Sequence, residues 1–78
     1  MDKAKLQLKI NEYSSNYDSL HTMVCSGCPA SDIERQQDLL HDMTVFLFCF
    51  GYKIIHQGGR WCLCTDDAFS EIVVIAEN

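Results

Sequence analysis

Apolar residues in the first third of the chain recur with a helical period. The alternation of Leu6, Leu8 and Ile10 is typical of a strand, but it accounts for only three positions. A helical period accounts for six, at spacings of three and four that share one helix face. We therefore predict a helix over about residues 2–24, with the Asp2 carboxylate at its positive end. The six positions are Leu6, Ile10, Tyr13, Tyr17, Leu20 and Val24.

A second helical pattern follows a loop at residues 25–30. Ser31 and Glu34 have the spacing of a capping box, so we expect this helix over about residues 31–50. Two helices joined by so short a loop should pack as an antiparallel hairpin. From residue 45 to residue 50 nearly every side chain is apolar, which predicts burial on several sides. The main apolar stripe of this helix is Ile33, Leu40, Met43, Leu47 and Phe50.

The pair Gly58-Gly59 separates two β-prone runs and predicts a β-hairpin over about residues 52–64, because a tight turn needs positive φ. A two-residue loop fixes the register, and alternate residues then share a face of the hairpin. We expect the helices to cover the face that carries the opposite pairs His56 with Trp61 and Ile54 with Leu63. The other face carries Lys53, Ile55, Cys62 and Cys64.

Residues 69–76 fit either a strand or a short helix. The β-branched run 72–75 favours a strand, which is the interpretation we prefer. The helical alternative places Phe69, Ile72, Val73 and Ala76 on one face. The sequence therefore predicts one α+β domain over residues 1–78, in which an antiparallel two-helix hairpin packs on a small two- or three-stranded antiparallel β-sheet.

The charge balance narrows the classes of partner. Six Lys and Arg residues stand against eleven Asp and Glu residues, giving a net charge of −5 over 78 residues. This acidity argues against general nucleic-acid binding, which needs basic surface. The sequence shows no signal peptide and no apolar run long enough to span a membrane, so we expect a cytoplasmic protein with reduced thiols and no membrane partner.

The cysteines form the most specific motif. Cys25 and Cys28 have the C-x-x-C spacing of a zinc knuckle. Cys62 and Cys64 point to the same side of the expected strand and could complete a four-cysteine site. The interpretation we prefer is that these are reduced thiols that behave as small apolar residues, so that no cofactor is needed. The alternative is a zinc-stabilised structural or regulatory module that holds the ion with these four cysteines.

Two further thiol chemistries are weaker alternatives. Cys28 precedes a helix N-terminus, which lowers a thiol pKa, so a redox role of the C-x-x-C pair is a hypothesis. His21 and Cys25 are four residues apart on the first helix, as in a Cys–His nucleophile, but the sequence offers no third group to complete a catalytic site. We therefore predict no enzymatic activity.

The second helix supplies the expected interaction surface. Its C-terminal end is apolar on every side, and a fold of this size has little to cover it, so an exposed remainder would mark a protein interface. The lysines at positions 3, 5 and 9 are instead expected to be solvated. The candidate partner-binding residues are Asp38, Asp42, Phe46, Phe48, Phe50 and Trp61.

These features predict a small acidic protein-interaction module, an adaptor, inhibitor or regulator, that binds a second protein or a second copy of itself. In outline, two helices followed by a hairpin resemble winged-helix DNA-binding domains. The acidic second helix, with Asp38 and Asp42, and a hairpin with only Lys53 and Arg60 argue against that function. In size and cysteine content the chain resembles accessory proteins of phages and other mobile elements.

Overall fold

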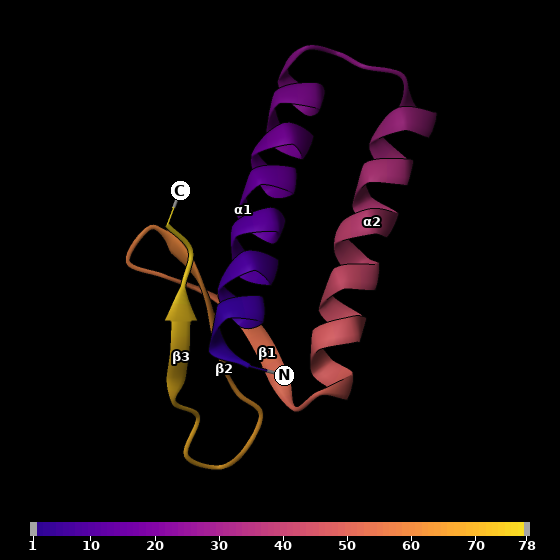
Figure 1. Ribbon diagram of the computed structural model, residues 1–78. Helices are drawn as coiled ribbons and strands as arrows, with labels where there is room; N and C mark the ends of the chain where they lie inside the picture. The colour runs from indigo at the N-terminus through magenta and orange to yellow at the C-terminus, as the bar shows by residue number, and fades with distance from the viewer. Residues whose placement is uncertain (1, 78) are drawn as a thin grey trace.

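The computed structural model, which describes residues 2–77, contains two helices followed by a three-stranded antiparallel sheet (Figure 1). This arrangement confirms the predicted α+β fold class, with a helix pair on a small sheet. Neither helix is both long enough and apolar enough to cross a membrane. The elements are α1 (Lys3–Cys25), α2 (Ala30–Cys49), β1 (Tyr52–Gln57), β2 (Arg60–Thr65) and β3 (Ile72–Ile75).

The first helix is capped by a side chain and runs without a break. The Asp2 carboxylate accepts a hydrogen bond of 2.9 Å from the Lys5 backbone N–H, which satisfies one of the free donors of the first turn. Its apolar stripe is buried only near the N-terminus, where Leu6 and Ile10 are sealed. Further along, Tyr17 is partly exposed although its ring contacts Trp61 of β2, and Val24 is exposed.

The second helix begins one residue earlier than the sequence predicts. Pro29 is the N-cap residue, and no side chain caps the helix. The predicted capping box is therefore wrong: Ser31 lies inside the first turn, where its helical backbone prevents it from acting as a cap. The Pro29 carbonyl instead accepts hydrogen bonds from the N–H groups of Asp32 and Ile33.

The strands pair in the order β1-β2-β3. The hairpin has the predicted register, with Ile54 opposite Leu63, and Gly58 and Gly59 adopt φ of 63° and 77° in the turn. The C-terminal segment is a strand, as preferred. It is β3, which pairs with the edge of β2 that β1 leaves free and places Val74 opposite Leu63.

Both helices cover one face of the sheet: α1 crosses β2 and β3, and α2 lies beside β1 (Figure 1). Ile54 and Trp61 pack against this core as predicted, whereas His56 is exposed and its ring contacts that of Trp61. The Gln7 amide ties α1 to the sheet edge by a hydrogen bond of 2.7 Å to the Ile75 carbonyl. The buried core cluster is Leu6, Ile10, Leu47, Leu63, Val74 and Ala76.

The prediction that the apolar end of α2 is buried on several sides is wrong. Only Leu47 is sealed there, at 0% exposure. The helix contacts α1 and β1 along a single stripe, and no further layer of the fold covers the rest of its surface. The side chains left exposed are Val45, Phe46, Phe48 and Phe50.

Candidate partner-binding groove

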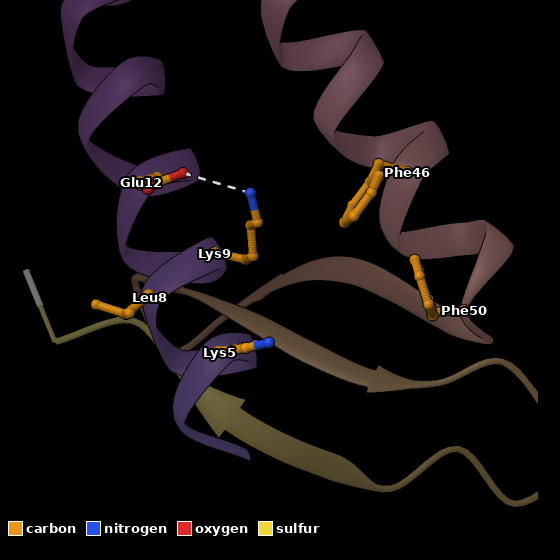
Figure 2. Close-up of a pocket in the computed structure, with 6 residues that line it drawn as sticks. All are labelled: Lys5, Leu8, Lys9, Glu12, Phe46 and Phe50. Carbon is orange, nitrogen blue, oxygen red and sulfur yellow. Dashed lines mark ion pairs between the residues drawn. The ribbon is translucent and has the colours of Figure 1, made fainter. Parts of the chain in front are cut away.

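A groove runs between the N-terminal half of α1 and the C-terminal half of α2, outside the core (Figure 2). It encloses about 510 Å³. A second hollow of about 230 Å³ shares Lys9 and Phe46 with it and extends to Asp42 and Met43. We call the two together the interhelix groove. The larger part is lined by Lys5, Leu8, Lys9, Glu12, Phe46 and Phe50.

The α2 wall of the groove is aromatic. Phe46 and Phe50 are four residues apart, so they stand one above the other on the helix. Their ring centroids are 5.1 Å apart with the planes tilted by 54°. The two side chains are 44% and 51% exposed, and Leu8 on the α1 wall is 62% exposed. The groove therefore offers apolar surface that a ligand could remove from water.

The α1 wall is basic. Lys5 and Lys9 lie one turn apart, and Figure 2 shows both reaching toward the space between the helices. The Lys9 Nζ lies 5.3 Å from the centre of the Phe46 ring, a cation–π contact that joins the two walls. Within residues 2–77, the Lys5 ammonium takes part in no ion pair.

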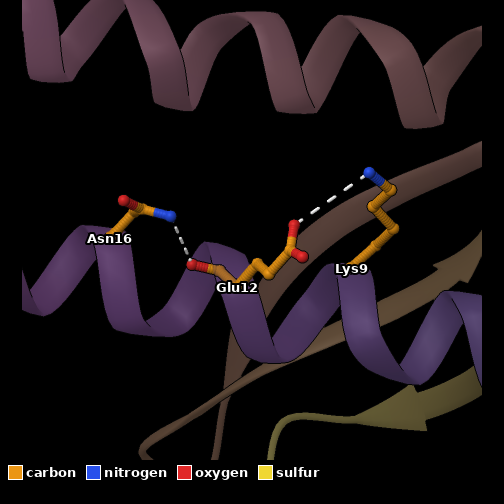
Figure 3. A network of polar contacts seen from close by, with 3 residues as sticks. All are labelled: Lys9, Glu12 and Asn16. Carbon is orange, nitrogen blue, oxygen red and sulfur yellow. Dashed lines mark hydrogen bonds and ion pairs between the residues drawn. The ribbon is translucent and has the colours of Figure 1, made fainter.

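Lys9 also lies 4.0 Å from a Glu12 carboxylate oxygen (Figure 3). The two side chains are 41% and 60% exposed, so water screens the pair and it contributes about 1 kcal/mol at most. The Glu12 carbonyl accepts a hydrogen bond of 2.8 Å from the Asn16 amide, within the helix. The Lys9 ammonium can therefore exchange Glu12 for a partner's carboxylate at little cost.

The structure brings together only some of the predicted partner-binding residues. Phe46, Phe50 and Asp42 line the groove. Asp38 is exposed one helical turn before Asp42. Phe48 is 57% exposed, but it lies two residues from Phe46 and so faces away from the groove.

Trp61 is separate from the groove and packs within a cluster of rings. Its ring lies 5.1 Å from that of Tyr13, 4.7 Å from that of Tyr17 and 4.7 Å from that of His56. Burial raises the pKa of the Tyr13 phenol, partly offset by a hydrogen bond with Thr44. This cluster attaches α1 to β2, which indicates a structural role.

Most of the groove residues that sequence reasoning missed lie on α1; the exception is Met43 of α2, which the sequence analysis assigned to the apolar stripe of that helix. Leu8 falls outside the helical stripe, and the lysines at 5 and 9 are unremarkable as isolated charges. The one signal was the strand-like alternation at residues 6–10, which marks Leu8 as an apolar residue off the core face. Such a residue faces either solvent or a partner.

The predicted four-cysteine metal site is not assembled. Cys25 and Cys28 lie at the end of α1 and in the loop before α2, whereas Cys62 and Cys64 are buried in the central strand β2. Within residues 2–77, no three His, Cys, Asp or Glu side chains gather closely enough to hold a metal ion. The spacing was misleading because a C-x-x-C pair at a helix junction and a C-x-C pair on a strand need not meet.

The remaining thiols differ in environment. The Cys25 Sγ lies 3.7 Å from the His21 Nε2, as their spacing on α1 predicts. Both side chains are exposed on the last turns of the helix. Cys49 is also exposed, at the end of α2.

The groove thus combines exposed apolar side chains with charged groups of both signs. Protein interfaces combine an apolar centre with a polar rim in the same way. Comparisons of the chain with protein-family models, with curated proteins and with solved structures gave no match.

Proposed function

We propose that this protein is a small non-enzymatic interaction module, an adaptor, inhibitor or regulator, that binds a protein surface through the interhelix groove. The observation that carries the proposal is the half exposure of Phe46 and Phe50 side by side in a groove. Neighbouring aromatic side chains that are half-exposed in a groove are characteristic of protein interfaces, where buried aromatic side chains supply most of the affinity.

The charges around the groove would orient the partner. Lys5 and Lys9 lie on one wall and Asp42 on the other, so a bound segment meets opposite signs on its two sides. Charges at an interface contribute more to orientation and choice of partner than to affinity. Two lysines are few for contacts to phosphates, and the chain as a whole has a net charge of −5 that would repel nucleic acid. Both facts favour a protein partner.

The state of the cysteines supports a cytoplasmic location for this module. All five thiols are free. Small domains in oxidising compartments usually carry disulfides, whereas cytoplasmic proteins keep their thiols reduced.

A capture experiment tests the proposal. The protein is immobilised and exposed both to a lysate of its source cells and to a soluble, labelled copy of itself. Retained proteins are quantified by mass spectrometry. We compare the wild type with Phe46→Ser/Phe50→Ser, which removes the aromatic wall, and with Phe48→Ser, an equal change on another side of α2.

We expect the double variant to lose at least ten-fold of the specifically retained protein and Phe48→Ser to retain it. Circular dichroism of each variant establishes that it is folded. Capture that is equal for all three proteins, or absent for all three, would contradict the proposal.

A further inference from the structure

The two walls of the interhelix groove are complementary to one another. The α1 wall presents Lys5 and Lys9, with Glu12 beside Lys9, and the α2 wall presents Phe46, Phe50 and Asp42. Lys9 and Asp42 line the same hollow, so they lie at the same level along the helices. They are nevertheless not an ion pair within the chain. The α1 wall is thus the kind of surface that the α2 wall would bind.

A two-fold axis exploits this relationship. In a symmetric dimer, each surface patch contacts its own copy, so residue i meets residue j and j meets i. An axis that runs along the groove exchanges the walls at constant level, because it places α1 of one copy opposite α2 of the other. Lys9 then faces Asp42 of the partner subunit, and each aromatic α2 wall faces the α1 wall of the other copy.

We propose that the occupant of the groove is a second copy of this chain, packed face to face through α1 and α2. The proposal rests on the groove being a protein-binding surface and names its partner. The two helix pairs form a four-helix arrangement with the sheets on the outside, a packing that helical hairpins commonly adopt.

The outer face of the whole helix pair, which extends beyond the groove, sets the largest area that this dimer could bury. Helices of 23 and 20 residues are about 30 Å long, and a packed pair is about 20 Å wide, which gives an outer face of about 600 Å² per copy. Stable protein interfaces bury about 800 Å² per partner, with a wide spread. A compact monomer of 8.9 kDa has an accessible surface of about 4,800 Å². The accessible surface of this chain is 5166 Å², so the chain exposes more surface than a compact monomer of its mass.

The small core also favours a dimer. A domain of 78 residues buries a smaller share of its surface than larger domains, and such domains often gain stability from a metal, a disulfide or a partner subunit. All five cysteines are free, and the described residues form no metal cluster. Packing of α1 and α2 on a second copy would supply the missing cover for Phe46 and Phe50.

The open face of the sheet is a weaker candidate for the same role. It exposes Ile72 and Ile75 and carries Lys53. Strands of six, six and four residues span only about 20 by 15 Å, or about 300 Å². That area is too small for a stable interface on its own.

Sedimentation velocity over a hundred-fold range of concentration tests the proposal, with charge reversals at the groove. We expect wild type to shift from monomer to dimer as the concentration rises. Lys5→Glu/Lys9→Glu and Asp42→Lys should each weaken the dimer at least ten-fold when alone. Mixed in equal amounts, they should form a heterodimer, because the reversed charges attract again.

Both reversals are compatible with folded helices. Glutamate at position 5 is favourable in the first turn of α1, and positions 9 and 42 are accessible to solvent, so neither change buries a charge. Lys53→Glu is the matched control on the sheet face and should dimerise as wild type does. Phe46→Ser/Phe50→Ser should be monomeric at every concentration.

Each other outcome overturns the proposal in a recognisable way. A strictly monomeric wild type that still captures another protein through Phe46 and Phe50 would leave the interaction function standing and exclude the second copy. A monomer with no groove-dependent capture would refute both. A dimer unaffected by the charge reversals would use another surface. An anionic amphiphile found on the monomer by native mass spectrometry would replace the protein occupant.

Discussion

The ammonium of Lys9 lies 5.3 Å from the centre of the Phe46 ring and so connects α1 with α2 on the side remote from the sheet. The contact lies at the point where the two parts of the interhelix groove meet. The contact holds the aromatic wall beside the basic wall and keeps the Lys9 ammonium close to the Phe46 ring.

This contact should contribute modestly to stability. We predict that Lys9→Met lowers the free energy of unfolding by about 0.5–1 kcal/mol, because a half-exposed cation–π contact is lost while the aliphatic stem is retained. Urea unfolding followed by circular dichroism measures the change. In a double-mutant cycle, Phe46→Leu should abolish most of the effect of Lys9→Met; equal effects in both backgrounds would show that the contact is not stabilising.

The central strand should be the least tolerant part of the fold. Leu63 is 0% exposed and contacts the core beneath α1, so Leu63→Ala should cost about 2–5 kcal/mol through lost burial and a cavity. Leu8→Ala is the matched control, because Leu8 is 62% exposed and should change stability by about 0.5 kcal/mol or less. Comparable losses for the two variants, measured by thermal or urea unfolding, would place Leu8 in the core and contradict the account of the groove.

Burial separates the cysteines by reactivity. Cys25 and Cys49 are exposed and should react with iodoacetamide in the native protein, whereas Cys62 and Cys64 should be at least ten-fold slower and react only as the protein opens. Peptide mapping by mass spectrometry resolves the sites. Rapid alkylation of Cys62 or Cys64 would show that these thiols are accessible in the folded protein and would contradict their burial in β2.

Tyr13 should make the fold sensitive to alkali. Burial raises the pKa of this phenol above its ordinary value of 10.0, so the folded state retains the proton that the unfolded state loses first. The resulting stabilisation is complete below pH 10 and is lost as the pH rises through the folded-state pKa. We predict that the stability of Tyr13→Phe falls less between pH 9 and about 11 than that of wild type. Identical slopes for the two proteins would show that the phenol titrates as it does in water.

Local patterns in the sequence were sufficient to predict the secondary structure. The spacing of Leu6 and Ile10 marks α1, and Gly58-Gly59 sets a hairpin register that the structure reproduces. The cap of α2 was mispredicted because Pro29 starts the helix before Ser31. Propensity could distinguish a strand from a helix at residues 72–75 only as a preference, and pairing of Val74 with Leu63 decides it.

Only the α2 wall of the groove was predictable from the sequence. Phe46 and Phe50 are visible in the sequence as excess apolar surface on α2. Their juxtaposition with Lys5 and Lys9 depends on how α1 packs against α2, which no local pattern records. The same reason explains the cysteines: the distance between Cys25 and Cys62 is a property of the tertiary fold.

Photo-crosslinking at position 46 is the decisive test of whether the interhelix groove binds a protein. A photoreactive phenylalanine analogue replaces Phe46 in one sample and Phe48 in another, and each protein is irradiated with a labelled second copy and, separately, with lysate of its source cells. The account predicts a protein adduct from position 46, with the second copy as the captured species, and at least ten-fold less from position 48. Equal yields at the two positions, or no protein adduct at position 46, would contradict a protein-binding role for the interhelix groove.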